Sequence, residues 1–168
     1  MHKLFFVIGA SGSGKTTIIH ALEKMSFPNY QMIYFDSIGV PSSTEMLENG
    51  DNPEEWQRLK TFEWVKIIKE QFLRDTHVIL DGQTRPQFIE EACLKNHIIN
   101  YDIILFDCSD QERTKRLMKR GQPELANQQM MDWAKYLRER CLDFHIIDNT
   151  HLNENETLLS LIKVLKIE

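Results

Sequence analysis

Short apolar runs alternate with longer segments of helical periodicity along the chain. Five runs are rich in β-branched and aromatic residues: 3–8, 31–36, 76–81, 101–108 and 144–148. Each is almost continuously apolar, which is typical of strands buried on both faces of a parallel sheet. The pattern therefore predicts five parallel strands.

Helical spacing of apolar positions marks the segments between these runs. The predicted helices cover residues 15–25, 54–73, 86–95, 109–120, 128–142 and 153–167. Pro86 suits the first position of its helix, and Ser109 with Asp110 suits a cap. Alternation of strands and helices indicates an α/β fold with a doubly wound sheet, and 168 residues suit a single domain, 1–168.

Acidic residues stand where the predicted strands end. Four of the five strands end at or near an aspartate: Asp36, Asp81, Asp107 and Asp148. In open α/β sheets, ligands bind outside the carboxyl ends of the strands. This edge is therefore the expected site.

The overall charge and the cysteines narrow the class of protein. The net charge is −5, so no general basic field favours nucleic acid as a partner. Cys93, Cys108 and Cys141 have no metal-ligand spacing and are expected to be reduced in a cytoplasmic protein. The apolar start is too short for a signal peptide, and no run predicts a membrane span. Monomer and homodimer both remain open.

A glycine-rich loop follows the first predicted strand and leads into the first helix. The segment GASGSGKT fits the pattern G-x-x-x-x-G-K-[ST], in which backbone amides cradle the phosphates of a nucleoside triphosphate. Lys15 would reach the β- and γ-phosphates, and the Thr16 hydroxyl would bind Mg²⁺. The expected nucleotide-binding residues are Gly9, Ala10, Ser11, Gly12, Ser13, Gly14, Lys15, Thr16 and Thr17.

A carboxylate and an arginine follow the third strand, in LDGQTRP. Asp81 is expected beside the glycine-rich loop, where it would hold the Mg²⁺ ion or its waters. An alternative is that Asp81 caps a turn with Gly82. Arg85 is placed to reach a phosphate near Asp81, although a surface role also fits it.

Basic residues cluster in ERTKRLMKRG, after the fourth strand. On a helix, Arg116 and Arg120 share a face, which Arg113 can join. Such a pair of guanidinium groups could clamp a transferring phosphoryl group and neutralise its charge. The alternative is a solvated basic face.

Three motifs together resemble the nucleoside-monophosphate-kinase-like group of P-loop kinases: residues 9–16, 81–85 and 116–121. The resemblance implies a five-stranded parallel sheet in the order 2-3-1-4-5, with helices on both faces. It assigns Asp81 to the metal, Arg85 to phosphate, Arg116 to the adenine side and Arg120 to the phosphates. It also implies a short lid, residues 121–128, followed by a further arginine, for which Arg138 and then Arg140 are the candidates.

The acceptor is expected to bind to a helical region, residues 37–75. Residues 41–57 contain no basic side chain and five acidic ones, which is unfavourable for a nucleoside monophosphate. Asp36 resembles the substrate-binding aspartate of shikimate and gluconate kinases and could take the proton of a hydroxyl acceptor. A strand-end Asx turn is its alternative interpretation.

These patterns predict a kinase that uses a nucleoside triphosphate and Mg²⁺, and the resemblance implies that the nucleotide is ATP. Lys15, Asp36, Arg85, Arg116 and Arg120 would carry the transfer of the γ-phosphate to a small molecule, either a nucleotide or a hydroxyl-bearing metabolite. A regulatory nucleotide-binding module without turnover, or a nucleoside triphosphate hydrolase, is the alternative. The base-reading Asn-Lys-x-Asp segment of GTPases is absent from the sequence.

Overall fold

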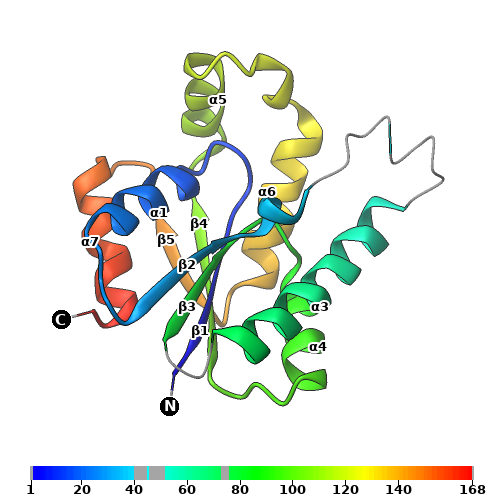
Figure 1. Ribbon diagram of the computed structural model, residues 1–168. Coiled ribbons are helices and arrows are strands. Elements are labelled where there is room, and N and C mark those ends of the chain that lie inside the picture. Colours follow the sequence, from blue (N-terminus) through cyan, green and yellow to red (C-terminus); the bar gives the residue numbers. More distant parts are fainter. Residues whose placement is uncertain (1, 40–44, 46–51, 73–75, 168) are drawn as a thin grey trace.

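The computed structural model describes residues 2–39, 45, 52–72 and 76–167, and within them five strands form one parallel sheet. The strands are β1 (Leu4–Ile8), β2 (Tyr30–Tyr34), β3 (His77–Asp81), β4 (Tyr101–Asp107) and β5 (His145–Asp148). Their order is β2-β3-β1-β4-β5, which confirms the predicted order (Figure 1). The register pairs Val7 with Asp81 and Tyr34 with Asp81, so three strands end at the same level.

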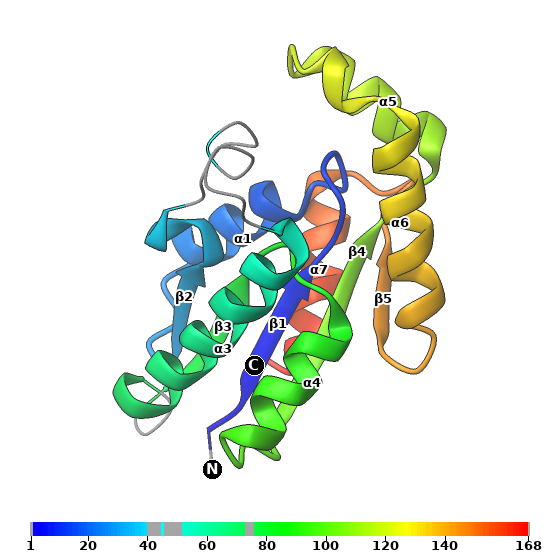
Figure 2. The same cartoon turned by 90° about the vertical axis from the view of Figure 1, so that its right-hand side faces the viewer.

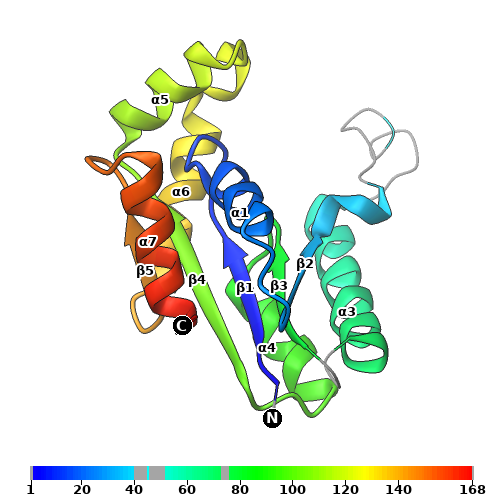
Figure 3. The same cartoon turned by 60° about the vertical axis from the view of Figure 1, so that its left-hand side comes forward.

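Helices cover both faces of this sheet. α3 (Pro53–Gln71), α4 (Pro86–Lys95) and α6 (Gln128–Arg140) lie on one face (Figure 2), and α1 (Lys15–Lys24) and α7 (Glu154–Leu165) lie on the other (Figure 3). α5 (Asp110–Lys119) extends beyond the carboxyl edge of the sheet. The expected Ser109 cap is present, with its side chain accepting a hydrogen bond from the Glu112 amide at 3.2 Å.

The strands bury alternate side chains in two apolar cores. Phe6 packs in the core under α3, α4 and α6, whereas Phe5 and Val7 pack in the core under α1 and α7. Side chains on a strand point to opposite faces in turn, so an almost continuous apolar run is required when both faces are covered. The two cores hold the carboxyl edge of the sheet in place.

β2 ends two residues earlier than the sequence predicts. It stops at Tyr34, and the chain continues as a short 3₁₀ helix, η1 (Phe35–Ile38), which contains Asp36. The Phe35 carbonyl accepts a hydrogen bond from Trp64 Nε1 at 2.9 Å, and the Phe35 side chain packs against Gly82. These contacts divert Phe35 from the sheet and place Asp36 at its carboxyl edge.

Part of the predicted acceptor region, namely residues 40–44, 46–51 and 73–75, lies outside the described residues. The predicted lid contains a second short 3₁₀ helix, η2 (Pro123–Leu125). No helix in the described part of the chain has both the length and the hydrophobicity that crossing a membrane requires.

All three cysteines are buried thiols. Burial raises the pKa of Cys93 and of Cys141 to about 12, and it also raises the pKa of Cys108. Cys108 lies beneath the glycine-rich loop, with its Sγ 3.7 Å from the Gly12 carbonyl oxygen.

Candidate active site

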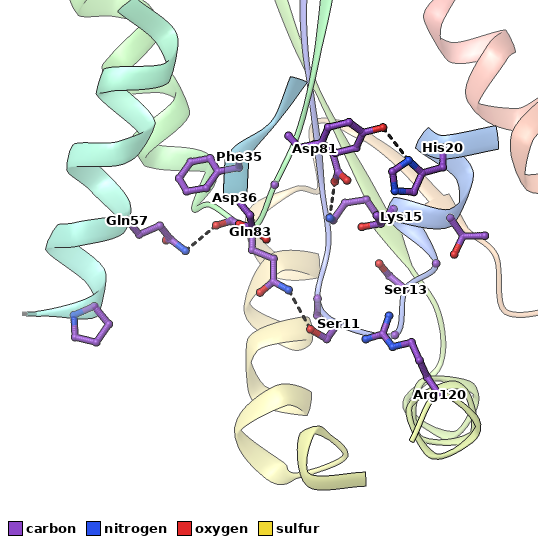
Figure 4. A pocket seen from close by; sticks show the side chains of 18 of the residues that line it. Ser11, Ser13, Lys15, His20, Phe35, Asp36, Gln57, Asp81, Gln83 and Arg120 are labelled. Atoms are coloured by element: carbon purple, nitrogen blue, oxygen red, sulfur yellow. Dashed lines mark hydrogen bonds and ion pairs between the residues drawn. The ribbon is translucent and has the colours of Figure 1, made fainter. Parts of the chain in front are cut away.

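A cavity of about 810 Å³ opens at the carboxyl edge of the sheet (Figure 4). The loop between β1 and α1 forms one wall, with residues 10–17. The end of β2, the start of α3 and the segment that follows β3 form the other walls, and Arg120 closes one side. This main cavity is therefore in the position that the strand-end aspartates predicted.

The glycine-rich loop depends on glycine at specific positions. Gly12 and Gly14 both have φ of 82°, in the left-handed region that side chains disfavour. A Cβ atom on Gly9 would lie 2.5 Å from the Phe106 carbonyl oxygen, so the loop can pass β4 only without one. Gly14 is the N-cap of α1, and no cap side chain accepts a hydrogen bond from the first amides of this helix. Free amides at a helix N-terminus bind anions such as phosphate.

Lys15 and Asp81 form a buried ion pair at the base of the main cavity. Lys15 Nζ lies 2.5 Å from Asp81 Oδ1, and both side chains are almost fully buried. Thr16, on the first turn of α1, lines the same cavity and carries a hydroxyl group. Amides and an ammonium group suit a triphosphate, and carboxylate and hydroxyl oxygens suit Mg²⁺. The donor set of this site therefore fits a nucleoside triphosphate with its metal.

The three arginines of α5 have three different environments. Arg120 is exposed, lines the main cavity and donates a hydrogen bond to Gln122 Oε1 at 2.7 Å. Arg116 is half-buried and donates to Asn149 Oδ1 at 2.8 Å and to the Asn149 carbonyl at 3.0 Å. Arg113 does not join them, because it is completely buried and contacts the glycine-rich loop from within the protein.

Asn149 was not among the predicted site residues. It is buried after β5, and its Nδ2 donates a hydrogen bond to the Ser13 carbonyl oxygen at 2.8 Å. Together with Arg116, it fixes the glycine-rich loop on the side that faces β5. The only signal in the sequence is its position at the end of a strand.

Two glutamines connect the acceptor side of the cavity to the loop. Gln57 Nε2 donates to the Gln83 carbonyl at 2.9 Å, and Gln83 Nε2 lies 3.1 Å from Ser11 Oγ (Figure 4). Asp36 and Trp56 line the same side. The structure thus brings Asp36 and the predicted triphosphate-binding residues into one cavity.

A tyrosine and a histidine line the cavity near Asp81. The Tyr34 hydroxyl donates to Glu23 Oε2 at 2.8 Å and lies 3.0 Å from His20 Nδ1. Burial, and after it the hydrogen bond to Glu23, raises the pKa of Tyr34 above its usual range. Tyr34 therefore remains a neutral hydroxyl group at physiological pH.

Arg85 lines a second cavity, of about 540 Å³, beside the main one. Its guanidinium donates to Gln57 Oε1 at 2.6 Å and pairs with Glu54 at 3.1 Å. It also packs over the ring of Trp133, with 5.1 Å between the guanidinium carbon and the ring centre. Arg85 thus reaches the acceptor side, with its charge balanced by a carboxylate.

The two arginines considered after the lid lie elsewhere. Arg138 pairs with Asp107 and with Asp110, the latter at 2.8 Å, and so ties α6 to β4 and α5. The Arg140 guanidinium packs over the Tyr136 ring. Neither is among the described residues that line the two cavities.

Comparison with known proteins identifies the family. Residues 6–136 match the AAA_18 family, described as an AAA domain, and the chain belongs to this family. No curated protein matches it.

Three solved structures, two of them described as kinases, share the fold over almost the whole chain. A sugar kinase from Janibacter sp. HTCC2649 is 18% identical with a TM-score of 0.68, and covers 99% of this chain and 96% of its own. A gluconokinase from Sinorhizobium meliloti 1021 is 15% identical with a TM-score of 0.64, over 98% and 95% of the two chains. The tunicamycin resistance protein of Deinococcus radiodurans is 15% identical with a TM-score of 0.68, over 100% and 98%. The predicted resemblance to P-loop kinases is thus confirmed, at the level of the fold.

Proposed function

We propose that this protein is a kinase that transfers the γ-phosphate of ATP to a hydroxyl group of a small molecule. One observation carries the proposal: Asp36 lines the same cavity as Lys15, the other residues of the glycine-rich loop and Arg120. A phosphate-binding loop alone fits many activities. A residue with a carboxylate in the same cavity adds the kind of group that a hydroxyl acceptor requires.

The residues of the cavity would divide the work as follows. The loop amides and Lys15 hold the β- and γ-phosphates, and Thr16 and Asp81 hold Mg²⁺, which when bound neutralises phosphate charge. Arg120 stabilises the charge of the phosphoryl group in transfer. Arg116 supports the nucleotide side through Asn149, while Arg85 orders the acceptor side through Gln57.

The transfer forms one bond to phosphorus and breaks another. The acceptor hydroxyl oxygen forms a bond to the γ-phosphorus, and the bond from that phosphorus to the β–γ bridging oxygen breaks. The bond's electron pair leaves with ADP, and the hydroxyl proton passes to the Asp36 carboxylate. A phosphate acceptor is already ionised and needs no such base.

The named relatives support a hydroxyl acceptor rather than a nucleotide. Two of the similar structures are described as a sugar kinase and a gluconokinase. In this chain Arg85 is paired with Glu54, so its charge is already balanced and is less available to the phosphate of a nucleoside monophosphate. A hydroxyl acceptor also gives the Asp36 carboxylate a chemical role, because such an acceptor needs a base.

Release of ADP from MgATP, measured with and without a panel of acceptors, tests the proposal. We expect release to depend on a hydroxyl-bearing acceptor. Asp36→Asn should lower kcat by about 100-fold or more while the Kd for ATP stays unchanged, because the lost group acts on the acceptor. Asp143→Asn, an exposed carboxylate after α6, is the matched control.

Two results would contradict the proposal. Hydrolysis of ATP at a rate that no acceptor changes would indicate a hydrolase. Tight ATP binding without turnover across a broad panel would indicate a regulatory module.

A further inference from the structure

The second cavity continues from the acceptor side of the main one. The two share four lining residues: Pro53, Gln57, Gln83 and Gln129. An acceptor that presents one hydroxyl to Asp36 can therefore extend its remaining atoms into the second cavity. The volume of about 540 Å³ is sufficient for a small metabolite.

The lining of the second cavity is rich in carboxamides and nearly neutral. Gln57, Gln83, Asn127 and Gln129 line it, and the side chain of Gln129 has no hydrogen-bonding partner among the described residues. A carboxamide offers both donors and an acceptor, as a hydroxyl group does. Trp133 adds an aromatic ring and a buried indole Nε1, for which the described part of the chain offers no hydrogen-bonding partner. These groups match a ligand with several hydroxyls on a compact apolar frame.

The charges of this lining disfavour an anion. Arg85 is the one cation among the described residues that line the second cavity, and Glu54 is the one carboxylate. They pair with each other at 3.1 Å, and Gln57 takes a further donor of Arg85 at 2.6 Å. A carboxylate or phosphate entering here would have to displace Glu54 and would meet its negative charge.

We propose, on the basis of the phosphotransfer proposed above, that the second cavity binds the body of an uncharged polyhydroxylated acceptor, of the sugar or polyol class. Gln83, Gln129 and Trp133 recognise its hydroxyls. The Glu54–Arg85 pair rejects acceptors that carry a carboxylate or a phosphate.

Matched acceptors test this specificity. We would measure kcat/KM for aldoses and polyols and for the aldonates and sugar phosphates that correspond to them. The neutral member of each pair should be preferred by at least about tenfold. Glu54→Gln should reduce that preference, because it frees the Arg85 cation, and Glu55→Gln, the neighbouring exposed carboxylate, should not. A wild-type preference for the anionic members would overturn the proposal.

Direct binding separates this proposal from the proposed function. If no acceptor increases ADP release, phosphotransfer itself is wrong, and binding of the same compounds is followed by ligand-observed NMR. Binding of neutral compounds that is lost in Trp133→Leu would support the subsite. Absence of neutral binding to the wild-type protein would overturn it.

A separate observation concerns Arg113, the largest fully buried side chain of the described residues. Its guanidinium donates to the Ser11 carbonyl at 3.0 Å, the Ala10 carbonyl at 3.4 Å and the Cys108 carbonyl at 3.3 Å. Asp107 balances the charge, with Oδ1 2.6 Å from Arg113 Nη2. Burying two charges removes both from water, and this desolvation offsets much of their attraction. A contribution to stability therefore does not by itself account for Arg113.

The geometry assigns Arg113 as a positioning residue for the glycine-rich loop. Two loop carbonyls are engaged by the buried guanidinium, so they cannot turn toward the phosphates. The amides at the N-terminus of α1, which no cap side chain satisfies, then remain for the phosphates. Arg113 touches neither substrate and acts through the loop.

Steady-state kinetics of Arg113→Lys test this role. We expect the KM for ATP to rise by about tenfold with the acceptor KM unchanged, because only the nucleotide loop is displaced. Arg138→Met is the matched control, since it removes the other guanidinium on Asp107 without touching the loop. A purely structural arginine would lower Tm and leave the KM for ATP unchanged.

If Arg113→Lys does not fold, Asp107→Asn replaces it, because this change weakens the hold on Arg113 and keeps the side-chain shape. A folded variant of either kind with a wild-type KM for ATP would contradict the assignment.

Discussion

Lys15 Nζ lies 2.5 Å from Asp81 Oδ1, so the lysine of the glycine-rich loop and the carboxylate of the neighbouring strand neutralise each other inside the main cavity. Removing one partner leaves the other charge buried and unpaired, which destabilises a protein by about 3–5 kcal/mol. Lys15→Met should therefore unfold at lower urea concentration than the wild type. The double variant Lys15→Met/Asp81→Asn should recover most of the difference.

The same substitution also tests the role of Lys15 in turnover. Lys15→Met should also lower turnover by about 100-fold or more, because a donor to the phosphates is lost. Lys135→Met, an exposed lysine on α6, should change neither quantity. If Lys15→Met retained wild-type turnover, the loop could not be the phosphate site.

Asn149 provides a second test of the nucleotide side. Its side chain bonds both to the Ser13 carbonyl and to Arg116. Asn149→Leu leaves these buried groups unsatisfied, at a cost of about 1–3 kcal/mol. We expect the Kd for ATP, measured by calorimetry, to rise by about tenfold. Asn96→Leu, at the far end of α4, is the control and should leave the Kd unchanged.

Gly82 is expected to tolerate no side chain. A Cβ atom there would lie 2.5 Å from Phe35 Cβ and 2.9 Å from Phe35 Cγ. Gly82→Ala should destabilise the protein by about 1–3 kcal/mol in urea unfolding. Because Phe35 would move, acceptor-dependent turnover through Asp36 should fall as well.

Gly121 offers the comparison, since it has φ of 73° and no heavy atom lies within 4 Å of the position that a Cβ atom would occupy. Gly121→Ala carries only the conformational cost of about 1 kcal/mol and should leave turnover intact. Equal effects of the two substitutions would show that crowding at Phe35 is unimportant.

The lowered pKa of His77 predicts that the stability of the protein depends on pH. Its Nδ1 accepts a hydrogen bond from the Lys3 amide at 3.2 Å, and burial lowers its pKa below the ordinary value of 6.5. The unfolded chain therefore takes up the proton first as the pH falls. Neutral His77 therefore contributes fully to the free energy of unfolding above pH 6.5. This contribution is lost as the pH falls through the pKa that His77 has in the folded protein.

Thermal unfolding across this pH range would detect the effect. Tm should decrease more steeply in the wild type than in His77→Gln, which keeps an acceptor for Lys3 and does not titrate. His151→Gln, at an exposed histidine, should follow the wild type. Identical slopes for all three proteins would contradict the assignment.

The sheet and the nucleotide loop were predictable because their signals are local. Continuous apolar runs gave the strands, and the spacing of glycines before Lys15 gave the loop. The predicted strand order came from the resemblance to P-loop kinases and is confirmed. The end of β2 was missed by two residues, because contacts of Phe35 with Trp64 and Gly82, distant in sequence, determine it.

The supporting residues of the site could not be predicted in the same way. Nothing local distinguishes Arg113 from Arg116 and Arg120, since burial beneath the loop depends on how α5 packs. Gln57 and Gln83 are likewise ordinary polar residues until the fold joins their elements. The roles of Asp36, Arg85, Arg116 and Arg120 remain predictions that the experiments above address.

The reactivity of the three buried thiols can measure how often parts of the protein open. Because burial suppresses the thiolate of Cys93, Cys108 and Cys141, a thiol reagent added to the native protein reacts only when a segment opens. Cys108 lies under the nucleotide loop, and Cys93 lies on α4. Labelling followed residue by residue would therefore separate local opening of the loop from unfolding of the whole core, without any introduced probe.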